Sequence, residues 1–313
     1  FHERKQRLER ARDCYRRGMG ALAKADKNPD TWDARIQGDA TLQLRFGSVS
    51  LMLGELRAGE HALQLALDIA SDAGLPWVEV RAHIELGRSY LQRGKNPLAR
   101  AHLGQARALL RIEEDPQLHL EALEAAAALA FDEGRNAEAE ALWQEALSRA
   151  ADDPQAVVRC QIGLSNRYLR SGQYDAAGPL LETALKSARE AGDRILEGRV
   201  LNNIGLLHSW SHRYEEALSS YRRALEVREG IGYTRGVVIN HHNVGDTHFQ
   251  VEDWAKAYVA FQRSRELAEE MGWLRGVVLN DTYMAFIRAI RGQCDVDELL
   301  ACTERARELG DTE

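Results

Sequence analysis

The segment Arg199-Val-Leu-Asn-Asn-Ile-Gly205 recurs in outline as Ile239-Asn-His-His-Asn-Val-Gly245 and, earlier in the chain, as Arg81-Ala-His-Ile-Glu-Leu-Gly87. The small residue that closes each copy serves as the anchor of a repeat that occurs seven times. The anchors are spaced by 40 residues, apart from one step of 38, at Gly47, Gly87, Ala127, Ser165, Gly205, Gly245 and Ala285. Self-similarity at a fixed period predicts a repeat protein rather than a pair of globular domains.

Positions outside the anchor segment support this alignment. Small residues lie twelve and nineteen positions after six of the anchors, at Gly59, Ala99, Ala139, Ala177, Ala217 and Ala257, and at Ala66, Ala106, Ala146, Ala184, Ala224 and Ser264. Bulky residues lie between them, at Leu63, Leu103, Trp143, Leu181, Tyr221 and Phe261. This spacing is typical of one helix face. The seventh repeat has Asp297 and Glu304 in the small positions, so we expect a weak final repeat or a chain that stops short there.

Each repeat is predicted to be two helices of about 15–18 residues joined by a turn. The turns are expected seven residues after the anchors, near Gly54, Gly94, Gly134, Gly172, His212, Glu252 and Gly292. Glycine inside a helix costs about 0.5–1 kcal/mol relative to alanine, so its return at the anchor predicts a close approach of two helices. Pro179 lies six residues after Gln173, and we expect the helix there to start late or to bend.

These motifs resemble the tetratricopeptide repeat. Its pattern of Leu-Gly, then Tyr, then a small-bulky-small triplet is met by Leu86, Gly87, Tyr90, Ala99, Leu103 and Ala106. The period of 40 is similar to that of kinesin light chain, of spindle-orientation adaptors and of bacterial multidomain regulators. The resemblance implies an all-α, right-handed α-solenoid in which residues 39–313 form seven repeats. Residues 1–38 would then be an N-terminal helix or a degenerate capping repeat.

Composition limits the classes of function. The formal net charge is −7, from 41 Lys and Arg against 48 Asp and Glu, which argues against a broad surface for nucleic acid or membranes. The four cysteines are scattered and form no CxxC pair, as is typical of a reducing, cytoplasmic setting. Cys14 and Cys160 lie on predicted helices and are expected to be buried. High Ala and Arg content favours a bacterial source, and the start at Phe1 suggests a piece of a longer protein.

The sequence contains no P-loop, dinucleotide fingerprint, HExxH or GxSxG motif, so we expect no enzyme and no cofactor. The best candidate for a chemical site is a group of histidines, His208, His212, His241, His242 and His248, whose spacing suits a metal. The alternative is core packing, because His208 and His248 occupy the position of Tyr90 and Tyr168 in other repeats. We favour packing and predict no metal.

The resemblance also implies where a partner binds. In this family the first helices line an inner groove, with ligand-facing positions six and three before the anchor and one and five after it. Together with their polar neighbours, these positions give the candidate groove residues Arg81, Arg88, Arg159, Asn166, Arg170, Arg199, Asn202, Trp210, His242, Asn243 and Asp246. The third repeat differs, since it carries Glu121 and Glu124 there. Recurring arginines in an acidic protein favour an acidic partner, although a polar inner face is also normal for any soluble solenoid.

We therefore predict a non-enzymatic scaffold that binds a protein or peptide segment in its groove, chiefly on repeats four and five. Two alternatives stay open, a ligand-sensing or peptide-sensing arm of a bacterial signalling regulator, and a structural spacer or self-association module. Trp210 is either a groove anchor or a cap on the hairpin core beside Tyr214. The sequence identifies neither the partner nor the oligomeric state.

Overall fold

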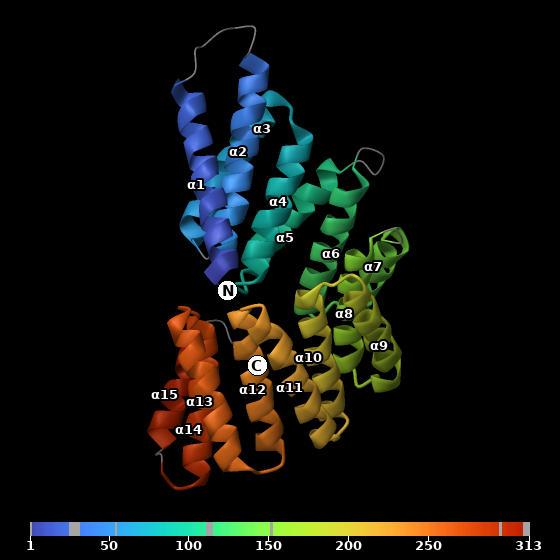
Figure 1. Cartoon of the computed structure of the whole chain (residues 1–313), viewed down its shortest axis with the longest axis vertical. Helices are drawn as coiled ribbons and strands as arrows, with labels where there is room; N and C mark the ends of the chain where they lie inside the picture. Colours follow the sequence, from blue (N-terminus) through green and yellow to red (C-terminus); the bar gives the residue numbers. More distant parts are fainter. Residues whose placement is uncertain are drawn as a thin grey trace. The chain divides into compact units, whose positions relative to one another are not determined.

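The chain is all-helical in the computed structural model, which describes residues 2–24, 32–53, 55–110, 115–150, 153–293 and 296–308. Among these residues there are fifteen helices and no strand, which confirms the predicted fold class (Figure 1). The helices fall into two compact units, Phe1–Asp152 and Asp153–Glu313. Within the described ranges, no helix is both long enough and apolar enough to span a bilayer.

The first unit is a stack of helix pairs that follows one additional helix. Helix α1 packs on α2, and the pairs α2/α3, α4/α5 and α6/α7 follow. The bounds are α1 (His2–Lys24), α2 (Trp32–Met52), α3 (Leu56–Ala73), α4 (Pro76–Leu91), α5 (Asn96–Leu109), α6 (Pro116–Asp132) and α7 (Asn136–Arg149). The predicted boundary between residues 38 and 39 therefore falls inside α2.

The second unit contains four further pairs. They are α8 (Pro154–Arg170) with α9 (Tyr174–Glu190), α10 (Arg194–Trp210) with α11 (Tyr214–Gly230), α12 (Thr234–Gln250) with α13 (Trp254–Glu270), and α14 (Leu274–Ile290) with α15 (Val296–Glu308). The first helix of a pair also packs on the first helix of the next, as α8 does on α10 and α10 on α12. The first helices α8, α10 and α12 thus form one wall of the unit.

The turns within the pairs occur where the repeat predicts them. Every predicted turn residue that the structure describes has a positive φ, namely Gly94, Gly134, Gly172, His212, Glu252 and Gly292; Gly54 lies outside the described residues. At Gly172 the left-handed conformation lets the amides of Gly172 and Gln173 bond to the carbonyls of Leu169 and Tyr168, at 3.0 and 2.9 Å. These bonds satisfy carbonyls that the helix end leaves unpaired.

The anchor glycines mark close contacts between the two helices of a pair, as predicted. A Cβ atom added at Gly205 would lie 2.3 Å from Cε1 of Tyr221, and one at Gly245 would lie 2.7 Å from Cδ1 of Phe261. Both rings are at most 1% exposed. The bulky residue of the second helix therefore occupies the space that the missing side chain of the first helix leaves.

Two details differ from the sequence-based predictions. Helix α9 begins at Tyr174 and contains Pro179, so the late start was wrong. Gly178 precedes this proline, and the absence of a Cβ atom there removes the clash that normally keeps the residue before proline out of the helical region. Cys160 is buried as expected, whereas Cys14 is exposed. The polar residues of the seventh repeat, Asp297 and Glu304, are exposed, as a weak final repeat requires.

The first unit contains a half-buried histidine pair. His83 on α4 and His102 on α5 approach to 2.9 Å between their Nδ1 atoms, and the ring of Tyr90 stacks on His102. Burial lowers the pKa of His83 to about 4, and the neighbouring His102 adds to that shift. Burial also lowers the pKa of His102. Both imidazoles are therefore neutral in the folded protein at neutral pH.

We expect the first unit to lose stability as the pH falls from 7 towards 4. The folded-state pKa of His83 lies below its unfolded value of 6.5, so the unfolded chain takes up the proton first in this window. Because the site is half-exposed, we expect a loss of about 1–2 kcal/mol from His83. The free energy of unfolding, measured in urea, should differ less between pH 7 and pH 4.5 for His83→Gln than for wild type. The exposed control His61→Gln should match wild type, and equal pH dependence in all three would contradict this account.

Candidate functional site

The arginines predicted to line the groove of the first unit form ion pairs within the protein. Arg81 on α4 contacts Glu121 on α6 at 2.6 Å, and Arg88 contacts the same carboxylate at 3.2 Å. Glu124 lies 3.9 Å from Arg88. The basic positions of the second repeat and the acidic positions of the third thus neutralise each other. This leaves the wall of the second unit as the stronger candidate surface.

A chain of hydrogen-bonded asparagines crosses that wall. Asn203 Nδ2 donates to Asn166 Oδ1 at 2.6 Å, Asn202 Nδ2 to Asn203 Oδ1 at 3.5 Å, and Asn243 Nδ2 to Asn202 Oδ1 at 3.0 Å. We call these four residues the amide ladder. It connects α8, α10 and α12, with Asn202 and Asn203 buried and the end residues Asn166 and Asn243 half-buried. The structure therefore brings the predicted residues Asn166, Asn202 and Asn243 into one network.

Positive charge lies beside the first part of the ladder. Arg170 on α8 and Arg199 on α10 are exposed, and Arg159 on α8 is half-buried with Asp153 at 3.9 Å. A cationic patch next to amide donors suits carboxylates and carbonyl oxygens.

On α12 the groove positions of the wall carry Asp246 and His242 instead of arginines. Burial raises the pKa of Asp246, although the nearby His242 and a hydrogen bond from Gln250 oppose that shift. The ring of His242 donates from Nδ1 to Asn280 Oδ1 at 3.1 Å, in the tautomer that gives Asn280 an N–H partner. Burial lowers the pKa of His242. Its titration therefore moves to more acidic pH.

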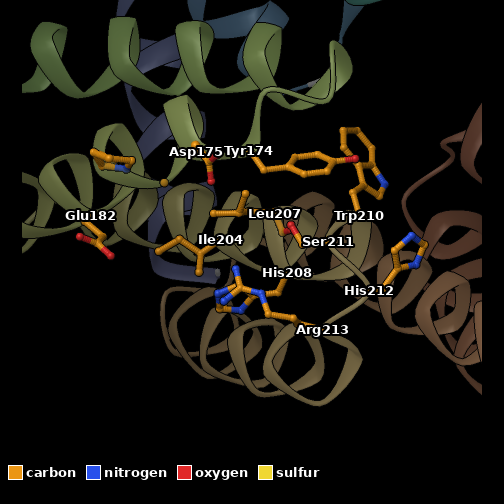
Figure 2. Close-up of a pocket in the computed structure, with 12 residues that line it drawn as sticks. Tyr174, Asp175, Glu182, Ile204, Leu207, His208, Trp210, Ser211, His212 and Arg213 are labelled. Carbon is orange, nitrogen blue, oxygen red and sulfur yellow. The ribbon is translucent and has the colours of Figure 1, made fainter.

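Trp210 lines a separate pocket. It packs on the core formed by α8, α9 and α10 and borders a pocket of about 820 Å³ between α9 and α10 (Figure 2). Tyr174 of the preceding pair lines the same pocket, whereas Tyr214 bonds to His212 at 2.8 Å. Ile204 and Leu207 contribute apolar surface, and Asp175 and Arg213 add opposite charges. Trp210 thus packs on the core, as one of the two interpretations expects, but Tyr174 rather than Tyr214 lines the pocket beside it. The pocket includes no ladder residue.

Sequence reasoning missed the corresponding face of α14. The same four positions counted from Ala285 are Leu279, Thr282, Phe286 and Ile290, and the three apolar ones are 38%, 45% and 48% exposed. Phe286 contacts Phe249 of α12, with ring centroids 5.7 Å apart. The groove rule applied to the seventh repeat would have found this apolar stripe.

The histidines form no metal centre in the part of the chain that the structure describes, where no cluster of three metal-ligating side chains occurs. His208 is half-buried and lies 3.4 Å from the hydroxyl of Ser220, and His248 is also half-buried. Their placement fits the packing interpretation.

Comparison with known proteins shows what this arrangement is similar to. Residues 196–270 match the tetratricopeptide repeat model. Regulatory protein RapG of Bacillus subtilis is 32% identical over 80 residues, which cover 26% of this chain and only 21% of RapG. A Rap protein complexed with competence and sporulation factor is similar in structure, with a TM-score of 0.74 at 16% identity over 98% of this chain and 88% of that chain. NprR in complex with its cognate peptide NprX has a TM-score of 0.68 at 16% identity, over 98% and 86%. At such identities the structural similarity shows a shared fold.

Proposed function

We propose that this chain, a tetratricopeptide-repeat protein, binds an extended segment of a partner protein or peptide on the wall formed by α8, α10 and α12. The amide ladder is the observation that carries the proposal. Asparagine side chains offer the same donor and acceptor groups as a peptide backbone, so a row of them can bond to an extended chain whatever its side chains. The two half-buried ends of the row, Asn166 and Asn243, lie on α8 and α12, which suits a segment several residues long.

The charges on the wall indicate the chemistry of that segment. Arg170 and Arg199 lie on the α8 and α10 side, whereas Asp246 lies on α12 and the apolar stripe on α14. A segment with an acidic group over α8 and α10 would complement this distribution. A bulky apolar side chain would cover Phe286 and Ile290 at the far end.

Two comparisons support a binding role. NprR was solved with its cognate peptide and a Rap protein with competence and sporulation factor, and both share this fold. RapG is a regulatory protein, which favours the signalling alternative, in which binding on the wall alters a regulator. A binding scaffold and a signalling regulator would both bind the segment on this wall, so one experiment tests both functions.

Selection from a phage-displayed library of seven-residue linear peptides tests the proposal. We expect wild type to enrich peptides with an acidic residue, and the double variant Arg170→Glu, Arg199→Glu to bind them at least about tenfold more weakly, a loss of about 1.4 kcal/mol. The control Arg222→Glu, Arg223→Glu makes the same charge change at exposed positions of the second helix α11 and should bind as wild type does. Failure to enrich any peptide, or equal weakening by both double variants, would refute it.

A further inference from the structure

Arg228 is a buried cation on the second helix α11 that contacts the ladder residue Asn202. It belongs to α11, the second helix of its pair, and is 3% exposed. Its side chain passes two glycines, one on each neighbouring first helix. A Cβ atom at Gly198 of α10 would lie 3.0 Å from Arg228 Cγ, and one at Gly236 of α12 would lie 2.8 Å from Cδ. The absence of side chains at these two positions leaves the passage for the guanidinium.

The partners of this guanidinium are all neutral. Nη1 donates to the carbonyl of Gly236 at 2.7 Å, to Asn202 Oδ1 at 3.4 Å and to Asn240 Oδ1. Among the described residues Arg228 forms no ion pair with a carboxylate, and its Nε has no hydrogen-bond partner. Burial lowers its pKa to about 10, which leaves it protonated at neutral pH. A buried charge without a counter-ion is costly, so folding alone gives little reason for an arginine here.

The chemistry of the guanidinium determines which way the amides turn. An asparagine amide can face a neighbour with its oxygen or its nitrogen, and the network decides which. Arginine only donates, so Asn202 must present Oδ1 to Arg228. Asn202 then has only Nδ2 to offer Asn203, which in turn must accept with Oδ1 and donate to Asn166. On the other side, Asn243 must donate to the same oxygen of Asn202.

We propose that Arg228 is a positioning residue that fixes the direction of the amide ladder, so that Asn166 presents Nδ2 and Asn243 presents Oδ1 to a bound segment. Neither of these two end groups makes a hydrogen bond to any described residue. A carbonyl of the segment then lies over α8 and an N–H over α12, which selects one register and chain direction. This inference rests on the proposed function, because it assumes that the segment bonds to the ladder.

The first test follows the ladder itself and needs no ligand. Side-chain amide resonances of ¹⁵N-labelled protein are compared for wild type, Arg228→Met, Arg228→Lys and the control Arg222→Met, which changes an exposed arginine of the same helix. We expect the Asn202, Asn203 and Asn243 resonances to shift or split only in Arg228→Met, because lysine retains a buried donor. Unchanged ladder resonances in a folded Arg228→Met protein would overturn the proposal. Should that variant fail to fold, Arg228→Gln, which can present either its oxygen or its nitrogen, serves the same purpose.

The second test uses a peptide selected on wild type, with each backbone N–H replaced in turn by N-methyl. We expect one N-methylation to weaken binding to wild type and to Arg228→Lys about tenfold, and to weaken binding to Arg228→Met less than about threefold. An identical N-methyl profile in all variants would overturn the positioning role. Absence of any selected peptide would refute the proposed function alone, since the resonances still decide whether Arg228 orients the ladder.

Discussion

Gly205→Ala is expected to lower the free energy of unfolding of the second unit by about 1–3 kcal/mol. The added methyl group would lie 2.3–2.8 Å from three atoms of the Tyr221 ring. That ring is 1% exposed and has no solvent to move into, so α10 and α11 must separate slightly. Separation of this pair would also disturb the packing around Arg228. Urea unfolding followed by circular dichroism measures the loss.

Two companion variants show whether the ring is the cause. In the background of Tyr221→Leu, Gly205→Ala should cost less than it does alone, because the pair then resembles Ser165 with Leu181, which the structure accommodates with both residues fully buried. Gly230→Ala, at the end of α11, is the control in the same pair, since its added Cβ atom would meet nothing within 4 Å and its φ is not positive. It should be neutral or stabilising by up to about 1 kcal/mol. Equal costs for Gly205→Ala in both backgrounds would contradict the explanation.

Removal of both arginines around Glu197 is expected to lower the free energy of unfolding of the second unit by about 3–5 kcal/mol. Glu197 is 4% exposed, and its carboxylate accepts from Arg189 Nε at 2.9 Å and from Arg194 Nη1 at 2.5 Å. Arg189→Met together with Arg194→Met would leave a buried carboxylate without a counter-ion. Because Glu197 lies at the start of α10, this loss would also loosen the helix that carries Asn202 and Asn203.

Removal of the carboxylate instead of the two arginines should destabilise the protein less. Glu197→Met should cost about 1–2 kcal/mol, because the two arginine side chains are about half-exposed and can return to water. Urea unfolding at pH 7 measures both losses, and similar losses for the two variants would contradict this account.

The fold could be predicted in unusual detail because a repeat fixes every element relative to one anchor. Glu252 illustrates this, since glutamate is not a typical left-handed residue, yet it adopts a positive φ where most other turns have glycine. Its position in the repeat outweighed its residue type. The start of α2 at Trp32 was harder to place, because the small positions that define the repeat lie after the anchor and do not extend into that segment.

The candidate site could be predicted only in part, since groove positions say which helix face a residue occupies but not what it bonds to. Arg81 and Glu121 occupy the same position in successive repeats, and only the structure shows that they neutralise each other. The ladder is similar, because Asn203 lies outside the groove positions yet connects Asn202 to Asn166. Arg228 has no signal in the groove pattern at all, since it comes from the second helix through a gap between two glycines.

Photo-crosslinking of a peptide selected on wild type tests the central claim most directly. The peptide carries a photoreactive group at one position at a time, and mass spectrometry identifies the residues to which it attaches. We predict attachment to the wall of the second unit, on α8, α10 and α12 next to Asn166, Asn202 and Asn243. Attachment confined to the pocket beside Tyr174 and Trp210, or to the first unit, would contradict the account.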